Sequence, residues 1–256
     1  MPHPFSNPLQ PKHSAMSVAI WFSTVWLTVL LYLVMLIATA LAFSFDKSRK
    51  IQHFLCFWWS DAVIFFNPYW RVKVRGIENI DHGRTYVIVA NHQSMADIVL
   101  LFQTRMQFKW VAKNSLFRVP ILGWCMTLAR HVRLKRENFS SIKQAYRQAE
   151  NWLNNGVSVM FFPEGTRSRT GEMSSFRNGA FKLAMKNQMP ILPIAIDGTA
   201  NAAPKGKWIF RPSGTITMTI LPGIDPGNSS YQDMERIKLT AWERINSCLG
   251  HSSRQA

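Results

Sequence analysis

The sequence is poor in cysteine, and it lacks several signatures that would point to a particular chemistry. Three cysteines occur among 256 residues, and no two of them have the Cys-x-x-Cys spacing. We therefore expect neither a disulfide framework nor a cysteine-based zinc site, and the chain suits a reducing compartment. Gly-rich nucleotide loops, a GxSxG nucleophile and an HExxH zinc motif are absent as well.

Acidic residues are also few, which leaves a strong excess of positive charge. The chain has 14 Asp and Glu against 30 Lys and Arg, so its formal net charge at pH 7 is +16. This charge indicates anionic partners: nucleic acid, a membrane surface, or a phosphorylated or acidic substrate. No RNP, zinc-finger or helix-turn-helix pattern supports nucleic acid, so we expect no nucleic-acid partner. Apolar residues make up 47%, enough for a sizeable core.

A long stretch near the N-terminus contains no charged residue and no histidine. It covers residues 14–45, a run of 32, whereas crossing the hydrocarbon core of a bilayer takes about 20 residues. Lys47, Arg49 and Lys50 follow this run and only Lys12 precedes it, so the excess of positive charge places its C-terminal side in the cytoplasm. A cleavable signal peptide is the competing interpretation, although the run is longer than the apolar core of about 7–15 residues that such peptides have.

A second apolar stretch, residues 54–66, is too short for a typical span and carries Asp61 in its middle. Its clustered aromatic residues suit the headgroup boundary of a membrane, and they equally suit an ordinary core helix. With the first run it predicts a membrane-seated helical hairpin over residues 1–69. The remaining residues, 70–256, are predicted to form the second domain.

The second domain shows short apolar runs separated by amphipathic helices. Strands are predicted at residues 70–74, 86–90, 108–112, 131–134, 157–162, 191–196 and 215–221. Helices are predicted at residues 138–155, 176–185 and 231–249, with Phe139 and Ile142 among the inward residues of the first, and Met234, Ile237, Ala241 and Ile245 inward in the last. The alternation predicts an α/β fold, a mostly parallel central sheet flanked by helices, whose ligands gather at the carboxyl ends of the strands.

The first candidate site follows the predicted strand at residues 86–90. There His92 precedes Asp97 by five residues, a spacing that allows the carboxylate to orient the imidazole while the other ring nitrogen takes a proton. A structural role is the alternative, because Ser94 and Asp97 also fit a capping box at the start of a helix.

The second candidate site follows the predicted strand at residues 157–162. Pro163 ends that strand, Gly165 allows a close backbone turn, and Arg167 offers a planar fork that suits phosphate. Arg169 and Lys182 nearby are expected to be a solvated basic surface. Both candidate loops follow the carboxyl ends of strands, where a shared ligand crevice is expected.

Four blocks of sequence follow one another in order: NHQSMAD at residues 91–97, KNSLFRVPILG at 113–123, FPEGTRS at 162–168 and LPI at 192–194. Together they resemble the glycerolipid acyltransferase family, which includes the bacterial 1-acyl-glycerol-3-phosphate acyltransferases. The second block fits the family's Lys-x-x-Leu…Pro-x-x-Gly segment, and the last stands in place of its Val-Pro-Val-like motif. The resemblance covers about residues 74–221 and implies the fold of that family.

Two positions depart from the family pattern. Leu134-Lys135-Arg136 stands where many members read Ile-Asp-Arg, so Arg136 matches while Lys135 replaces an acid. Arg177-Asn178 stands where two basic residues are common. Both departures concern the choice of acceptor, and neither involves the His92 and Asp97 pair.

The resemblance implies transfer of a fatty acyl group from acyl-CoA or acyl carrier protein to the sn-2 hydroxyl of 1-acyl-glycerol 3-phosphate (lysophosphatidic acid). The product is phosphatidic acid, and no metal or further cofactor is expected. His92 would be the general base and Asp97 its orienting carboxylate. The site would lie at the inner membrane on its cytoplasmic side, against anionic lipids.

The resemblance also implies the residues that hold the substrates. Arg167 would bind the acceptor phosphate, with Gly165 and Thr166 shaping its loop and Glu164 positioning it. Lys113 and Arg136 are further candidates for anion contacts, to the phosphates of the donor or to its carrier.

Two alternatives stay open from the sequence. The same chemistry could act on glycerol 3-phosphate, another lysophospholipid or a lyso-aminolipid. A non-enzymatic basic membrane-binding protein is the more distant alternative, and it predicts binding that depends on many Lys and Arg residues and not on His92.

Overall fold

The computed structural model describes residues 11–136, 138–168, 172–203, 206–212, 214–226 and 231–250. Its centre is a seven-stranded sheet with the strand order β1-β7-β6-β2-β5-β3-β4, in which every neighbouring pair is parallel except β6 and β7. The strands are β1 (Arg71–Arg75), β2 (Val87–Ala90), β3 (Phe108–Lys113), β4 (Val132–Leu134), β5 (Ser158–Phe161), β6 (Ile191–Asp197) and β7 (Thr215–Ile220). The mostly parallel α/β sheet predicted from the sequence is confirmed, and each predicted strand lies within one residue of an observed one.

Burial along the strands explains their places in the sheet. β2 and β5 are buried at every position, as strands covered on both faces must be, and they lie at the centre. β7 alternates between buried and half-buried positions, and β1, at the edge, is mostly exposed. The two strands that carry the candidate loops are therefore both buried along their whole length.

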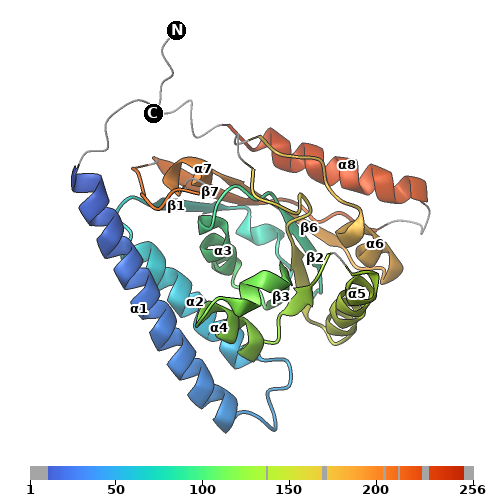
Figure 1. Cartoon of the computed structure of the whole chain (residues 1–256). Helices are drawn as coiled ribbons and strands as arrows, with labels where there is room; N and C mark the ends of the chain where they lie inside the picture. Colours follow the sequence, from blue (N-terminus) through green and yellow to red (C-terminus); the bar gives the residue numbers. More distant parts are fainter. Residues whose placement is uncertain are drawn as a thin grey trace.

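Helices cover both faces of the sheet (Figure 1). α1 (Pro11–Leu41), α2 (Lys50–Phe65), α3 (Ala96–Leu101) and α4 (Leu122–Leu128) lie over one face, with a core that contains Ile88 and Met160. α5 (Phe139–Asn154), α6 (Gly179–Lys186) and α8 (Tyr231–Ser247) lie over the other, with a core that contains Val87 and Val159. Short elements complete the chain: η1 (Ile77–Asn79), η2 (Phe102–Thr104), η3 (Asn114–Arg118) and α7 (Thr199–Ala202).

The predicted helices are confirmed, with two corrections. Phe139 was predicted to point inward, but it is 82% exposed because it is the first residue of α5, next to the loop that follows the edge strand β4. α6 begins at Gly179 and not at Phe176, because the backbone N–H of Arg177 donates to the carbonyl of Pro163 at 2.9 Å and holds the preceding segment against the second candidate loop. The four inward residues predicted for α8 are all buried.

α1 and α2 form an antiparallel hairpin. Trp59 Nε1 donates to Thr28 Oγ1 at 3.1 Å, and Gln52 Nε2 donates to Thr39 Oγ1 at 3.0 Å. The inner side of the hairpin shares a core with the sheet, and α1 also contacts the second predicted domain directly, where Trp21 Nε1 donates to the carbonyl of Trp208 at 2.7 Å. A division of the chain between residues 69 and 70 stays a prediction.

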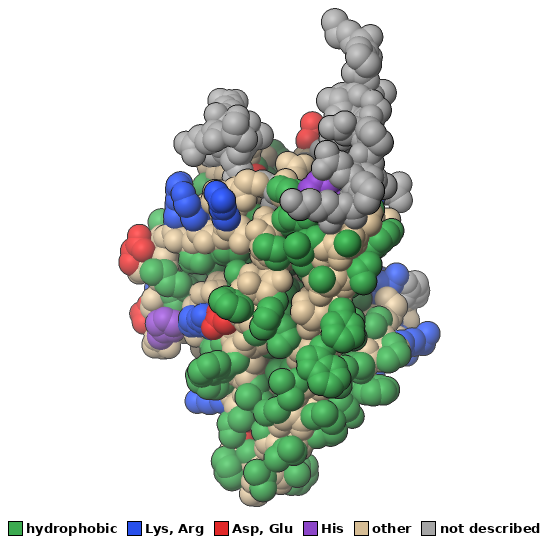
Figure 2. Space-filling view, turned by 90° about the vertical axis from the view of Figure 1, so that its left-hand side faces the viewer, with side chains coloured by type: hydrophobic (Ala, Val, Ile, Leu, Met, Phe, Trp, Pro, Cys, Tyr) green, Lys and Arg blue, Asp and Glu red, His purple; other side chains and the backbone are tan. Residues whose placement is uncertain are grey.

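The outer side of the hairpin is apolar and exposed. Figure 2 shows hydrophobic side chains gathered over this side of the molecule. They include Phe22, Trp26 and Ile37 of α1, and Phe54 and Trp58 of α2. α2 also buries Cys56 and Val63 on its inner side, so it is a core helix on one side and an exposed aromatic surface on the other.

α1 is, among the described residues, the one helix that is long and apolar enough to cross a membrane by length and composition. The segment is His13–Leu41, with a mean hydropathy of 2.3 in its most apolar window. Of that window, 11% is buried, which reflects the single side that packs against the rest of the chain.

Packing of α8 on the sheet tests the layer arrangement. We expect Ile237→Ala to lower the free energy of unfolding by about 2–5 kcal/mol, because Ile237 is fully buried and its truncation leaves a cavity. Leu239→Ala, on the same helix but 54% exposed, should change it by less than about 0.5 kcal/mol. Urea unfolding in mild detergent, followed by circular dichroism, measures both, and equal effects would contradict the arrangement.

Candidate active site

The two candidate loops meet where β2 and β5 end. These strands pair in parallel, with Val89 opposite Phe161, so their carboxyl ends lie at the same edge of the sheet. Glu164 joins the loops, because its carboxylate accepts the backbone N–H of His92 at 2.7 Å and that of Ser174 at 2.9 Å. Burial raises the pKa of Glu164, and these two N–H groups oppose the rise. Glu164 therefore holds the second loop against the first.

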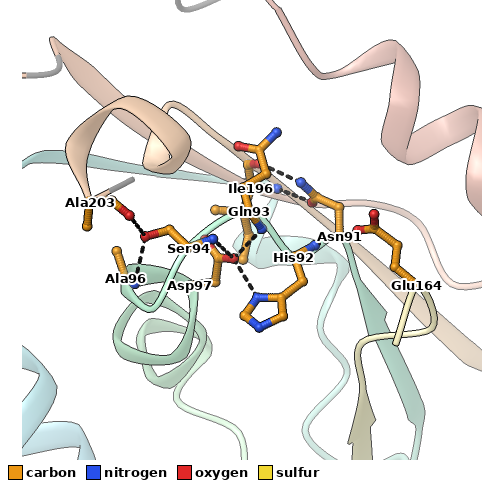
Figure 3. Close-up of polar contacts among 9 residues, drawn as sticks. All are labelled: Asn91, His92, Gln93, Ser94, Ala96, Asp97, Glu164, Ile196 and Ala203. Atoms are coloured by element: carbon orange, nitrogen blue, oxygen red, sulfur yellow. Dashed lines mark hydrogen bonds and ion pairs between the residues drawn. The ribbon is translucent and has the colours of Figure 1, made fainter. Parts of the chain in front are cut away.

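His92 and Asp97 form the expected pair (Figure 3). His92 Nδ1 lies 2.8 Å from Asp97 Oδ2; the carboxylate is fully buried, and the histidine side chain is 15% exposed. In neutral His92 this contact puts the proton on Nδ1 and leaves Nε2 as an acceptor. Figure 3 shows that Nε2 points away from Asp97. The imidazole is thus neither sealed in the interior nor free to turn.

Asp97 also supports the local backbone, as the alternative interpretation required. Its Oδ2 accepts the N–H groups of Gln93 at 2.7 Å and Ser94 at 2.8 Å, which fixes the entry into α3. Ser94 takes part in the same turn, because its Oγ accepts the backbone N–H of Ala96 at 3.2 Å while its hydroxyl donates to the carbonyl of Ala203 at 2.7 Å. One carboxylate therefore both orients the imidazole and anchors its loop.

Two further residues hold His92 and its loop in place, and neither was among the predicted site residues. The ring of Phe162 stacks on the imidazole with a centroid distance of 3.8 Å and an interplanar angle of 10°. Asn91 binds the main chain of Ile196 in β6 through two hydrogen bonds of 2.8 Å. Asn91 directly follows the predicted strand at residues 86–90, and Phe162 ends the predicted strand at residues 157–162. Both also belong to the sequence blocks, and this position was the signal available in the sequence.

Position 165 requires glycine, both because of its backbone conformation and because neighbouring side chains leave no room for a Cβ atom. Its φ of +80° is disfavoured for other residues, and a Cβ there would lie 2.9 Å from Arg177 Nε and 3.2 Å from Arg136 Nη1. Arg136 Nη1 donates to the Gly165 carbonyl at 2.6 Å. Two guanidinium groups therefore approach the second loop, of which Arg177 was noted in the sequence only as a departure from a motif.

Six of the eight predicted site residues line one cavity of about 270 Å³: His92, Lys113, Arg136, Gly165, Thr166 and Arg167. Asp97 and Glu164, the other two, are buried behind it and both bond to His92. Side chains of the hairpin, Leu31, Met35 and Trp59, form part of the apolar wall. The cavity thus combines a base, several cations and an apolar surface.

A second apolar cavity of about 390 Å³ lies next to the first. The two share Met95, Ile98 and Arg167 as lining residues, together with Thr28 and Trp59 of the hairpin. Met95, inside the first sequence block, borders both cavities. Among the described residues no group of three His, Cys, Asp or Glu side chains could hold a metal ion.

Comparison with known proteins agrees with this geometry. A family model described as acyltransferase matches residues 71–197. A 1-acyl-sn-glycerol-3-phosphate acyltransferase of Chlamydomonas reinhardtii is 35% identical over 231 residues, which cover 90% of this chain and 68% of the relative. A protein of the same name from Pseudomonas aeruginosa is 35% identical over 60% of this chain and 59% of its own length.

The structural comparison covers nearly the whole fold. The crystal structure of the 1-acyl-sn-glycerophosphate acyltransferase from Thermotoga maritima matches with a TM-score of 0.79 and 29% identity, over 92% of this chain and 94% of the other. The chloroplast relative LPAT1 of Arabidopsis thaliana is longer, and the match spans 53% of it. The chain belongs to the acyltransferase family, as its four sequence blocks indicated.

Proposed function

We propose that the protein transfers a fatty acyl group from acyl-CoA or acyl carrier protein to the sn-2 hydroxyl of 1-acyl-glycerol 3-phosphate, forming phosphatidic acid for phospholipid biosynthesis. The observation that carries this proposal is that His92, oriented by Asp97, lines the same cavity as Arg167. The names of the relatives and of the structural neighbour support the choice of acceptor. Other acceptors are outcomes of the tests below.

In the proposed reaction His92 acts as a general base. Nε2 accepts the proton of the acceptor hydroxyl as its oxygen attacks the thioester carbonyl, and Asp97 stabilises the imidazolium that forms. The tetrahedral intermediate then expels the thiolate, and the proton passes from His92 to the leaving sulfur. The new oxygen ester replaces the thioester, so no covalent acyl-enzyme is needed.

Cations around the base would hold the anionic groups. Arg167, on the loop shaped by Gly165 and Thr166, is placed to bind the acceptor phosphate, because a guanidinium matches phosphate with two parallel hydrogen bonds. Lys113 and Arg136 line the same cavity and are proposed to contact the donor. The two neighbouring apolar cavities would take the acyl chains, since their walls consist mainly of hydrophobic side chains.

The exposed side of the hairpin would face lipid. α1 and α2 are apolar on the side away from the sheet, and Lys47 and Lys50, which follow α1, are basic and exposed. We propose that this side sits in the inner membrane, with anionic headgroups near the basic residues and the sheet domain in the cytoplasm. Lipid substrates could then enter the cavities directly, because α1 and α2 form part of their walls.

Removing the base tests the reaction. We expect His92→Ala to lower kcat for acyl transfer by about 10²–10⁴-fold, the usual contribution of a general base. Asp97→Asn should also lower kcat, because the carboxylate no longer stabilises an imidazolium. His82→Ala is the control, since His82 is exposed on a distant turn. Product formation by purified protein measures the effects, and full activity in His92→Ala would refute the mechanism.

Removing the guanidinium tests the acceptor. We expect Arg167→Gln to raise KM for lysophosphatidic acid about 10-fold or more, because a charged hydrogen bond contributes about 1.5–3 kcal/mol. Acylation of a monoacylglycerol, which has no phosphate, should change much less. Arg118→Gln, a change of the same kind at an exposed arginine, serves as the control. An equal effect on both acceptors would mean that Arg167 does not bind the phosphate.

Removing exposed aromatic rings tests the membrane surface. We expect the double variant Phe54→Ser and Trp58→Ser to bind anionic phospholipid vesicles about 10-fold more weakly, because each ring loses apolar area that lipid would cover. Phe139→Ser is the control, since Phe139 is also exposed but lies on α5, which covers the other face of the sheet. Vesicle sedimentation measures binding, and a similar loss in both variants would contradict the proposed orientation.

A further inference from the structure

A polar cleft lies outside the cavity of His92, at the β4 edge of the sheet. Its volume is about 700 Å³, and its walls are the residues around β4 and one side of α5. The two hollows adjoin, because His131 lines both and the neighbours Lys113 and Asn114 line one each. A ligand bound in the cleft could therefore extend an arm toward His92.

The cleft is positively charged. Arg130, Arg133 and Lys135 line it, and none of the described lining residues is an acid. Arg133 is held in place by a hydrogen bond to Thr127 Oγ1 at 2.7 Å and by the ring of Phe117 at 4.5 Å. None of the three basic residues forms an ion pair with another described residue. Their charge is thus available to an anionic ligand.

The first turn of α5 adds donors to the same wall. Ser140 and Ser141 line the cleft, and this turn carries no acidic residue. Asn138 Oδ1 already accepts the N–H of Ser141 at 3.1 Å, and the other N–H groups at the start of this helix would favour an anion and reinforce the three basic side chains. Phosphate groups match this combination of guanidinium, ammonium, hydroxyl and backbone N–H groups.

The rest of the wall suits a nucleotide base. Trp152 lines the cleft, and Lys109 Nζ lies 4.7 Å from the centroid of its ring. The amide side chains of Gln148 and Asn151 line the cleft beside it. A purine stacks on an indole, and amide groups can bond the donors and acceptors on its edge.

His131 marks the passage between the two hollows. It is 9% exposed, and its Nδ1 accepts the backbone N–H of Trp110 at 3.2 Å, so its proton resides on Nε2. Burial lowers the pKa of His131 well below the ordinary value, and it is therefore neutral. The Nε2–H group has no partner among the described residues and could donate to a carbonyl of a passing chain.

We infer that this cleft binds the 3′-phosphorylated ADP portion of coenzyme A, with the pantetheine arm passing His131 to bring the thioester to His92. The inference rests on the proposed function, and it assigns a site to the soluble donor. A carrier protein is the disfavoured occupant, because docking a folded protein takes a surface of about 800 Å² per partner, whereas this is a concave site of small-molecule size.

Titration of free coenzyme A into the full-length protein in detergent tests the inference. We expect Lys135→Glu to weaken binding at least 10-fold, since Lys135 is exposed and its reversal puts an acid among the phosphates. Lys143→Glu makes the same change in net charge on the exposed surface of α5 outside the cleft, and it should change affinity less than about twofold. Pantetheine, which lacks the nucleotide, should bind both variants and the original protein equally.

Three results would overturn the inference. They are equal binding of coenzyme A by the two variants, no binding by the original protein, and a rise in KM for acyl carrier protein but not for acyl-CoA in Lys135→Glu. The binding measurement needs no turnover, so it separates this inference from the proposed reaction. Full activity in His92→Ala would remove the reaction and leave the binding result standing, whereas unchanged binding in Lys135→Glu would remove the cleft alone.

Discussion

The parallel pairing of β2 with β5 is the constraint on which the rest of the site depends. Val89 lies opposite Phe161, so the chain leaves both strands at the same edge and delivers His92 and Glu164 side by side. An antiparallel pair would send these loops to opposite edges of the sheet. Because every position of both strands is buried, a change of register would disrupt both cores, and the meeting of the two loops is fixed by hydrophobic packing.

The acidic and basic side chains of the site occupy different places: the acids are buried behind the cavity, and the arginines line it. The two carboxylates, Asp97 and Glu164, are buried and occupied with backbone N–H groups and the imidazole. Arg136 and Arg167 instead line the cavity. The acids therefore organise the loops without cancelling the positive potential that a phosphorylated ligand would meet, and much of the basic excess of the chain is left for its surface and clefts.

The apolar hairpin does more than present an exposed surface. Thr28 of α1 and Trp59 of α2 border both apolar cavities, and the same two residues bond to each other across the hairpin. The segment that the proposal seats in lipid thus also closes the space beside His92. In this proposal the same two helices attach the protein to the membrane and give lipid substrates access to the cavities, because the cavity walls and the exposed apolar surface are two sides of these helices.

The sequence by itself determined the strands, the alternation of strands with helices and the two loops, because period-2 and period-3.6 patterns, turn residues and contiguous motifs are local properties of a chain. It also identified eight site residues, whose geometry the fold brings together and whose roles stay predictions. Only the tertiary structure decided that Phe162 stacks on His92, that Arg136 and Arg177 converge on Gly165, and that Phe139 is exposed. The convergence of the two arginines joins positions far apart in sequence. The stacking of Phe162 on His92 depends on the path of the loop after β2, and the exposure of Phe139 depends on where α5 begins relative to the edge of the sheet. Strand order and layer boundaries are set by the packing of the whole core, which no local pattern encodes.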